Sequence, residues 1–143
     1  MLMNNGLIKI SNLKSMNNSV VYSMTEKQIG WYEVEPGKYK PLYRKIIQDT
    51  TPNTTTVGTN ATKDVNIADN IDLAFTNGGF ILSAYGLKFP IPQVSSDVII
   101  NCYVTNSNKL RIGNNNPNYN GATVYSFVYY IKTIDQAISL TWY

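Results

Sequence analysis

The segment Thr123–Lys132, TVYSFVYYIK, limits the fold of this chain more than any other part of the sequence. Its β-branched and aromatic residues favour a strand, and alternate side chains of a strand point to opposite faces of a sheet. Both faces are then apolar, one through Tyr125, Phe127, Tyr129 and Ile131 and the other through Val124, Val128 and Tyr130. Such a strand is either covered on both sides or takes part in a subunit interface.

Further strands and turns are expected along the chain. The expected strands are residues 31–34, 41–47, 73–75, 80–86, 97–105, 109–112 and 137–143. Turns are expected at residues 36–37 and 77–79, because glycine and asparagine tolerate positive φ. The spacing of Ser23 and Glu26 is that of a capping box and predicts a short helical turn over residues 25–29.

Many short strands with turns between them, and no long amphipathic helix, are typical of an all-β protein. We expect an antiparallel β-sandwich of jelly-roll-like form, in which residues 65–72 make a turn or short helix before a strand. Residues 1–21 hold too few apolar positions for a fold of their own and are expected to be an N-terminal attachment arm. Residues 22–143 are expected to form the sandwich, a size that suits one domain.

The composition removes most catalytic and metal-binding chemistry. The chain has no histidine and a single cysteine, Cys102, so one chain forms neither a Cys/His metal site nor an intramolecular disulfide. Cys102 lies in an apolar run and is expected to be a small buried side chain. Neither a phosphate-binding loop nor a nucleophile elbow is present in the sequence. We therefore expect no enzymatic activity, no catalytic residues, no metal and no cofactor.

Charge and hydropathy argue against two kinds of partner. Only 15% of the residues are charged and the net charge is +3, which is sparse for a nucleic-acid groove. The one basic cluster is expected to be a solvated strand face and consists of Lys38, Lys40, Arg44 and Lys45. No apolar run approaches the roughly 20 residues that span a bilayer. We expect no nucleic acid and no membrane insertion.

An ordered series of motifs resembles a module of bacteriophage tail-fibre, head-fibre and other virion appendage proteins. The motifs are YSMTEKQIGW (22–31), GK (37–38), KPLYRK (40–45), NIADNID (66–72), FPIPQVSS (89–96), INCYVTN (100–106) and YYIKTID (129–135). Together they extend over most of the chain. The series departs from the family pattern at residues 63–65, where KDV stands in place of the usual histidine.

The resemblance implies a β-sandwich that assembles as a homotrimer within a virion. The apolar surface of Thr123–Lys132 exceeds what one small core needs, and a surplus of this kind often lies at a subunit interface. The residues expected at the trimer interface are Tyr125, Phe127, Val128 and Tyr129. The arm residues expected to bind other virion proteins of the tail, collar or capsid are Leu7, Ile8 and Ile10. The short arm favours a head fibre, collar ornament or short tail appendage.

Three functions remain open. In the first, a trimeric appendage binds host-surface glycans through the polar loop 113–121, whose Tyr119, Asn116 and Asn118 supply a ring and amides; the alternative for this loop is an ordinary solvated connection. The second is a capsid-bound head fibre or decoration protein with a purely structural role. The third, less favoured, is a polysaccharide depolymerase.

A depolymerase would need paired carboxylates. The nearest approach to a cluster in the sequence is Asp64, Asp69 and Asp72. These three lack the spacing of a calcium loop. They are expected to be solvated turn carboxylates.

Overall fold

The computed structural model describes residues 22–139, which form two antiparallel sheets. The first sheet contains, in spatial order, β1 (Lys27–Glu35), β2 (Lys38–Thr50), β9 (Thr123–Lys132), β4 (Ile71–Leu82) and β5 (Lys88–Pro90), and the short β10 (Ile138–Ser139) also pairs with β2. The second sheet contains β3 (Ala61–Asn66), β8 (Lys109–Asn114), β7 (Ile99–Val104) and β6 (Gln93–Val94). The all-β antiparallel class is confirmed, whereas the sandwich, its jelly-roll-like form and the trimer stay predictions.

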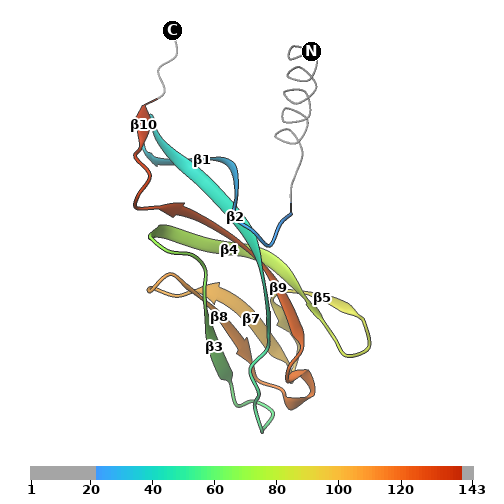
Figure 1. Ribbon diagram of the computed structural model, residues 1–143. Coiled ribbons are helices and arrows are strands. Elements are labelled where there is room, and N and C mark those ends of the chain that lie inside the picture. The colour runs from blue at the N-terminus through green and yellow to red at the C-terminus, as the bar shows by residue number, and fades with distance from the viewer. Residues whose placement is uncertain (1–21, 140–143) are drawn as a thin grey trace, which may run out of the picture.

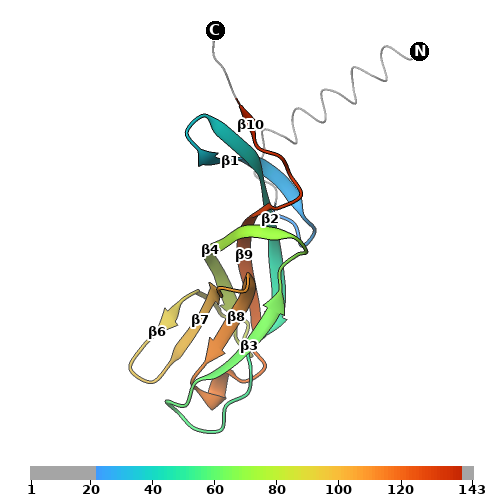
Figure 2. The same ribbon diagram turned by 90° about the vertical axis from the view of Figure 1, so that its left-hand side faces the viewer.

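The four-stranded sheet covers only part of the six-stranded one. In both views it lies beside the lower half of β2, β9 and β4, while β1 and β10 extend above it (Figures 1 and 2). One hydrophobic core holds residues of both sheets, including Leu110 and Ile112 of β8, Ile100 of β7 and Val128 of β9. The upper ribbon of β1, β2 and β10 thus projects beyond the core.

Strand β9 lies in the middle of the six-stranded sheet, between β2 and β4. The alternation predicted for it is present, because its even-numbered residues from Val124 to Tyr130 are fully buried while Tyr125, Phe127 and Tyr129 are half-buried. The even-numbered face turns toward the second sheet, as the shared core shows. The odd-numbered face is on the other side of the sheet.

The hairpin predicted around residues 36–37 is confirmed. Strands β1 and β2 pair antiparallel, with Trp31 opposite Pro41, and Gly37 takes a φ of +78° in the turn. The helical turn predicted over residues 25–29 is wrong, because Lys27 is already paired with Arg44 in β1. Strand pairing along the edge of β2 satisfies more backbone groups than one isolated helical turn, which has a high nucleation cost.

The turn predicted at residues 77–79 is also wrong. Strand β4 runs through these residues and its register with β9 shifts between Thr76 and Gly79. A Cβ at Gly79 would overlap the backbone carbonyl oxygen of Tyr125, and the residue has a φ of +149°. The glycines therefore form a β-bulge against β9 rather than a chain reversal.

The connection between β3 and β4 is a turn, not a short helix. Strand β3 ends at Asn66 and β4 begins at Ile71. Ile67 inserts into the core with 1% of its surface exposed, and Asn70 adopts a left-handed φ of +57°. Asparagine tolerates that conformation better than most residues, which explains how the chain reverses within so few residues.

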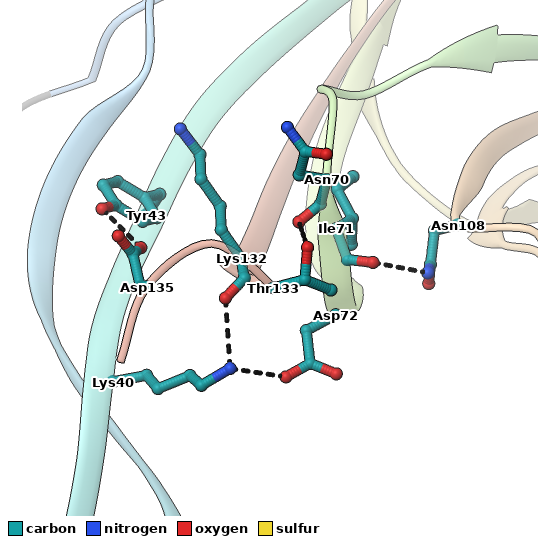
Figure 3. Close-up of polar contacts among 9 residues, drawn as sticks. All are labelled: Lys40, Tyr43, Asn70, Ile71, Asp72, Asn108, Lys132, Thr133 and Asp135. Carbon is teal, nitrogen blue, oxygen red and sulfur yellow. Dashed lines mark hydrogen bonds and ion pairs between the residues drawn. The ribbon is translucent and has the colours of Figure 1, made fainter. Parts of the chain in front are cut away.

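Polar contacts hold the upper end of β9 to its neighbours (Figure 3). Lys40 Nζ donates to Asp72 Oδ2 at 2.9 Å and to the carbonyl oxygen of Lys132 at 3.2 Å, so it links β2, β4 and β9. The hydroxyl of Tyr43, also in β2, donates to Asp135 Oδ2 at 2.7 Å. Burial and this hydrogen bond raise the pKa of Tyr43 to about 12.

The prediction of a solvated basic face on β2 is corrected by these contacts. The side chain of Lys40 is only 14% exposed, and Arg44 is buried with its guanidinium 4.6 Å from the centre of the Tyr22 ring. Burial lowers the pKa of Lys45. Of the four residues, Lys38 at the hairpin turn is the exposed one, and it pairs with Glu35 at 3.2 Å.

Candidate functional site

The candidate site is a pocket of about 750 Å³, here called the tip pocket, between the β4–β5 connection and the chain from β8 to β9. These two connections lie in the lower part of the domain, away from β1 and β10 (Figure 1). The lining residues are Leu82, Ser83, Ala84, Tyr85, Leu87, Phe89, Val98, Asn116, Asn118, Tyr119, Asn120, Gly121, Ala122 and Thr123. Its volume is in the range of pockets that hold small organic ligands.

The first wall is the hairpin that joins β4 to β5. The backbone N–H of Ser83 donates to Leu87 O at 2.9 Å, and that of Gly86 donates to Ser83 O at 3.0 Å. Gly86 has a φ of +78°, which glycine adopts without strain. This tight turn places Tyr85 at its tip, where 92% of the side chain is exposed.

The second wall is the asparagine-rich loop, and Asn114 is its central brace. Asn114 is fully buried. Its Nδ2 donates to Pro52 O at 3.0 Å and to Asn120 Oδ1 at 3.1 Å, and its Oδ1 accepts from the backbone N–H of Asn116 at 3.0 Å. One amide therefore ties both ends of the loop to the segment after β2.

Two other asparagines continue this bracing. Asn115 Oδ1 accepts from the N–H of Ile99 at 2.6 Å. Asn120 makes two bonds with the backbone of Thr54, its Oδ1 accepting and its Nδ2 donating, both at 2.9 Å. Residues 113–116 are buried. The prediction of a solvated polar loop is thus wrong for its first half. Gly113 and Asn114 are still paired in β8 with β3 and β7, and side-chain amides satisfy backbone groups beyond the end of that strand.

The three residues predicted to bind glycans all line the tip pocket, although they differ in what they offer. Asn116 is 5% exposed, its Oδ1 accepts from the N–H of Asn118 at 2.9 Å and its Nδ2 donates to Asp97 O at 3.0 Å. Its amide therefore shapes the loop. Asn118 is exposed, and its side chain has no hydrogen-bond partner within residues 22–139.

Tyr119 is half-buried rather than exposed. It ends the short 3-10 helix Pro117–Tyr119 and packs against the core, and Thr51 Oγ1 donates to its carbonyl oxygen. The fully exposed aromatic ring at this site is instead that of Tyr85. Sequence reasoning missed Tyr85, Leu87 and Phe89. The available signal was Tyr85-Gly86 between two strand segments, which is typical of a hairpin turn.

The residues predicted at a trimer interface separate onto two faces. Val128 is fully buried in the core of the single chain, so it is not part of an outer surface. Tyr125, Phe127 and Tyr129 lie on the opposite face, and we call the aromatic cluster there the outer aromatic face. Its members are Tyr22, Phe75, Phe80, Tyr125, Phe127 and Tyr129.

The outer aromatic face consists of stacked pairs across β4 and β9. Phe75 stacks on Tyr129 with ring centroids 5.3 Å apart, and Phe80 stacks on Tyr125 at 4.6 Å. Tyr22 remains 58% exposed and Phe75 36% exposed in the single chain. The three attachment residues Leu7, Ile8 and Ile10 lie outside the described residues.

The acidic residues considered for catalysis are not gathered at the pocket. Asp64 lies in β3 and makes two bonds to Arg111, at 2.7 and 3.0 Å, and Asp72 binds Lys40. Asp64 and Asp72 are ion-pair partners on strands rather than free turn carboxylates, whereas Asp69 is exposed in the connection between β3 and β4, as expected. Within residues 22–139 no cluster of three or more His, Cys, Asp or Glu side chains is arranged to hold a metal ion.

Cys102 is half-buried in β7, where it packs against the core, and burial raises its pKa to about 12. The expectation of a small buried side chain rather than a reactive thiol is consistent with this environment.

Across the described part of the chain, no helix is long and apolar enough to cross a membrane. No family model, curated protein or solved structure matches this chain.

Proposed function

We propose that this protein is a bacteriophage virion component, a trimeric fibre or appendage module that attaches to host-surface glycans through the tip pocket. The observation that carries the proposal is that two connections line one pocket, to which Tyr85 contributes an exposed ring and to which Asn118 and Tyr119 also contribute. Aromatic rings offer flat apolar faces to sugar C–H groups, and amides offer both donors and acceptors to hydroxyls.

The pocket favours binding over cleavage. Hydrolysis of a glycosidic bond ordinarily uses two carboxyl groups, and the described residues that line the tip pocket include neither aspartate nor glutamate. The pocket also has a rigid frame, because the buried Asn114 and its partners hold the loop before any ligand arrives. A preorganised site loses less entropy when it binds.

The experiment is binding of the labelled protein to an array of bacterial surface glycans. Tyr85→Ala removes an exposed ring and should weaken binding about tenfold or more, or about 1.4 kcal/mol. The matched control is Trp31→Ala, which removes a ring that is 49% exposed on β1 and should leave binding unchanged. Equal binding by wild type and Tyr85→Ala would refute the role of the tip pocket. Deleting the loop is a poorer test, since Asn114 supports the fold.

We further propose that the two sheets are the layers of a jelly-roll-like sandwich and that three copies associate through the outer aromatic face. Support comes from rings that a single chain leaves partly exposed, among them Tyr22 and Phe75. Sedimentation equilibrium should give a trimer for the wild type. Phe75→Asp should dissociate it without unfolding, because Phe75 lies outside the core. A wild type that stays monomeric at all concentrations would refute the trimer.

A purely structural head fibre or decoration protein is the second candidate. The outer aromatic face favours it, since stacked rings suit packing against another protein surface as well as against a copy of this chain. A host-adsorption assay on assembled particles separates the candidates. Particles that carry Tyr85→Ala adsorb normally if the role is structural and adsorb poorly if the protein is the adhesin.

A further inference from the structure

We infer that the saccharide bound in the tip pocket is uncharged, so that neutral sugars bind there and their uronic-acid, sialic-acid and phosphate-bearing counterparts do not. The inference rests on the proposed glycan-binding function and narrows it to one chemical class of ligand. It depends on the side chains that line the pocket and on those that the fold directs elsewhere.

No residue that lines the tip pocket, all of them within the described part of the chain, carries a charge. Two charged residues are sequence neighbours of lining residues, and neither contributes to the wall. Lys88 lies in β5 between Leu87 and Phe89, which both line the pocket. Because alternate residues of a strand point to opposite faces, the position of Lys88 between them directs its side chain away.

Asp97 is the second neighbour, next to the lining residue Val98. It is exposed, and its carbonyl oxygen accepts from Asn116 Nδ2 at 3.0 Å. That bond fixes the backbone of Asp97 beneath the loop, while its carboxylate is not among the groups that line the pocket. Lys88 and Asp97, the charged residues nearest in sequence to the lining residues, therefore do not contribute their side chains to either wall of the pocket.

A charged ligand would lose hydration in this pocket without gaining a counterion. Moving a carboxylate or phosphate out of water costs far more than moving a hydroxyl unless an opposite charge compensates. The wall offers neutral hydrogen-bonding groups at Asn118, Thr123 and the tyrosines, and apolar surface at Leu82, Leu87 and Phe89. Hydroxyls and ring C–H groups match that surface.

The test is the same purified protein on matched pairs of immobilised sugars that differ only in charge. Glucose and glucuronic acid form one pair, and galactose and galacturonic acid form another, alongside neutral and phosphate-bearing bacterial polysaccharides. High salt is used throughout, because the net charge of +3 would otherwise attract acidic glycans non-specifically. Tyr85→Ala and Trp31→Ala are measured in parallel on every glycan.

The expected result is binding to one or more neutral glycans, at least tenfold weaker binding to the acidic partner of each, and loss of neutral binding in Tyr85→Ala only. Acidic glycans that bind as well as neutral ones, with binding lost in Tyr85→Ala, would overturn the charge inference while leaving glycan attachment at the tip pocket intact. An absence of Tyr85-dependent binding to any glycan would overturn the proposed function itself.

Discussion

Replacing Asn114 by alanine tests whether one buried amide supports both the fold and the tip pocket. The substitution removes three hydrogen bonds, of 3.0, 3.1 and 3.0 Å. The N–H of Asn116 then stays buried without a partner, because Asn116 is only 5% exposed, and Pro52 O loses its donor in a half-buried position. Asn120 is exposed, so water replaces its lost contact.

The expected loss of stability follows from these two groups, which are left without hydrogen-bond partners. An unsatisfied buried donor or acceptor costs about 1–3 kcal/mol, and Pro52 O is partly open to solvent, so Asn114→Ala should lower the free energy of unfolding by about 2–4 kcal/mol. Domains commonly have about 5–15 kcal/mol of stability. The variant should therefore fold, with its urea midpoint lowered by about 1–2 M for an m-value of about 2 kcal/mol/M.

The assay is urea unfolding followed by circular dichroism, at one fixed protein concentration because association would shift the midpoint. The matched control is Asn118→Ala, four residues away in the same loop. Asn118 is exposed, so its loss should change stability by less than about 0.5 kcal/mol while weakening glycan binding. If Asn114→Ala has the wild-type midpoint, or if both variants are destabilised equally, the bracing role assigned to Asn114 is refuted.

Three further predictions concern the sheets. Gly79→Ala should lower the free energy of unfolding by about 3–5 kcal/mol through overlap and backbone strain, whereas Gly78→Ala, whose Cβ would meet nothing closer than 3.9 Å, should cost less than about 1 kcal/mol; similar urea midpoints for the two variants would contradict the bulge. Glu26 accepts hydrogen bonds from Lys132 Nζ at 2.7 Å and from the hydroxyl of Tyr130 at 2.6 Å. Burial alone would raise the pKa of Glu26, but these hydrogen bonds outweigh burial and lower the pKa below its ordinary value. A lowered carboxyl pKa contributes stability that is present above the ordinary value and is lost as the pH falls through the folded value, so Glu26→Gln should lose less stability than wild type on acidification; identical acid titrations would count against the ion pair. Cys102, with its pKa near 12, should react with a thiol reagent far more slowly in the native protein than in urea, and rapid native labelling would contradict its burial.

The sequence alone predicted the features that depend on near neighbours. The alternation in Thr123–Lys132 indicated a strand with two apolar faces, and this holds because side-chain direction in a strand follows directly from residue number. The hairpin around residues 36–37 was predictable for a similar reason, since proline and glycine set the local backbone dihedrals. The all-β class follows from the same short-range signals.

Only the tertiary structure decided how the glycines and asparagines are used. Residues 77–79 carry the signal of a turn, yet they form a bulge because β9 passes too close for a side chain at Gly79. Asn114 is of a residue type that is typical of solvated loops, yet it is fully buried because the carbonyl oxygen of Pro52 and the side-chain oxygen of Asn120 accept hydrogen bonds from its amide. Glycine and asparagine tolerate several conformations, so long-range contacts choose among them.

In the candidate site, too, some features could be predicted from the sequence and others depend on the tertiary structure. Sequence composition pointed to Tyr119 and Asn118 as residues able to contact a sugar, because a ring and an amide have that chemistry in any fold. Tyr85 joins them only because the β4–β5 hairpin and the chain between β8 and β9 line the same pocket. Chemistry is a property of each side chain and is read from the sequence, whereas a pocket is a meeting of distant segments, which only the packing of the two sheets brings about.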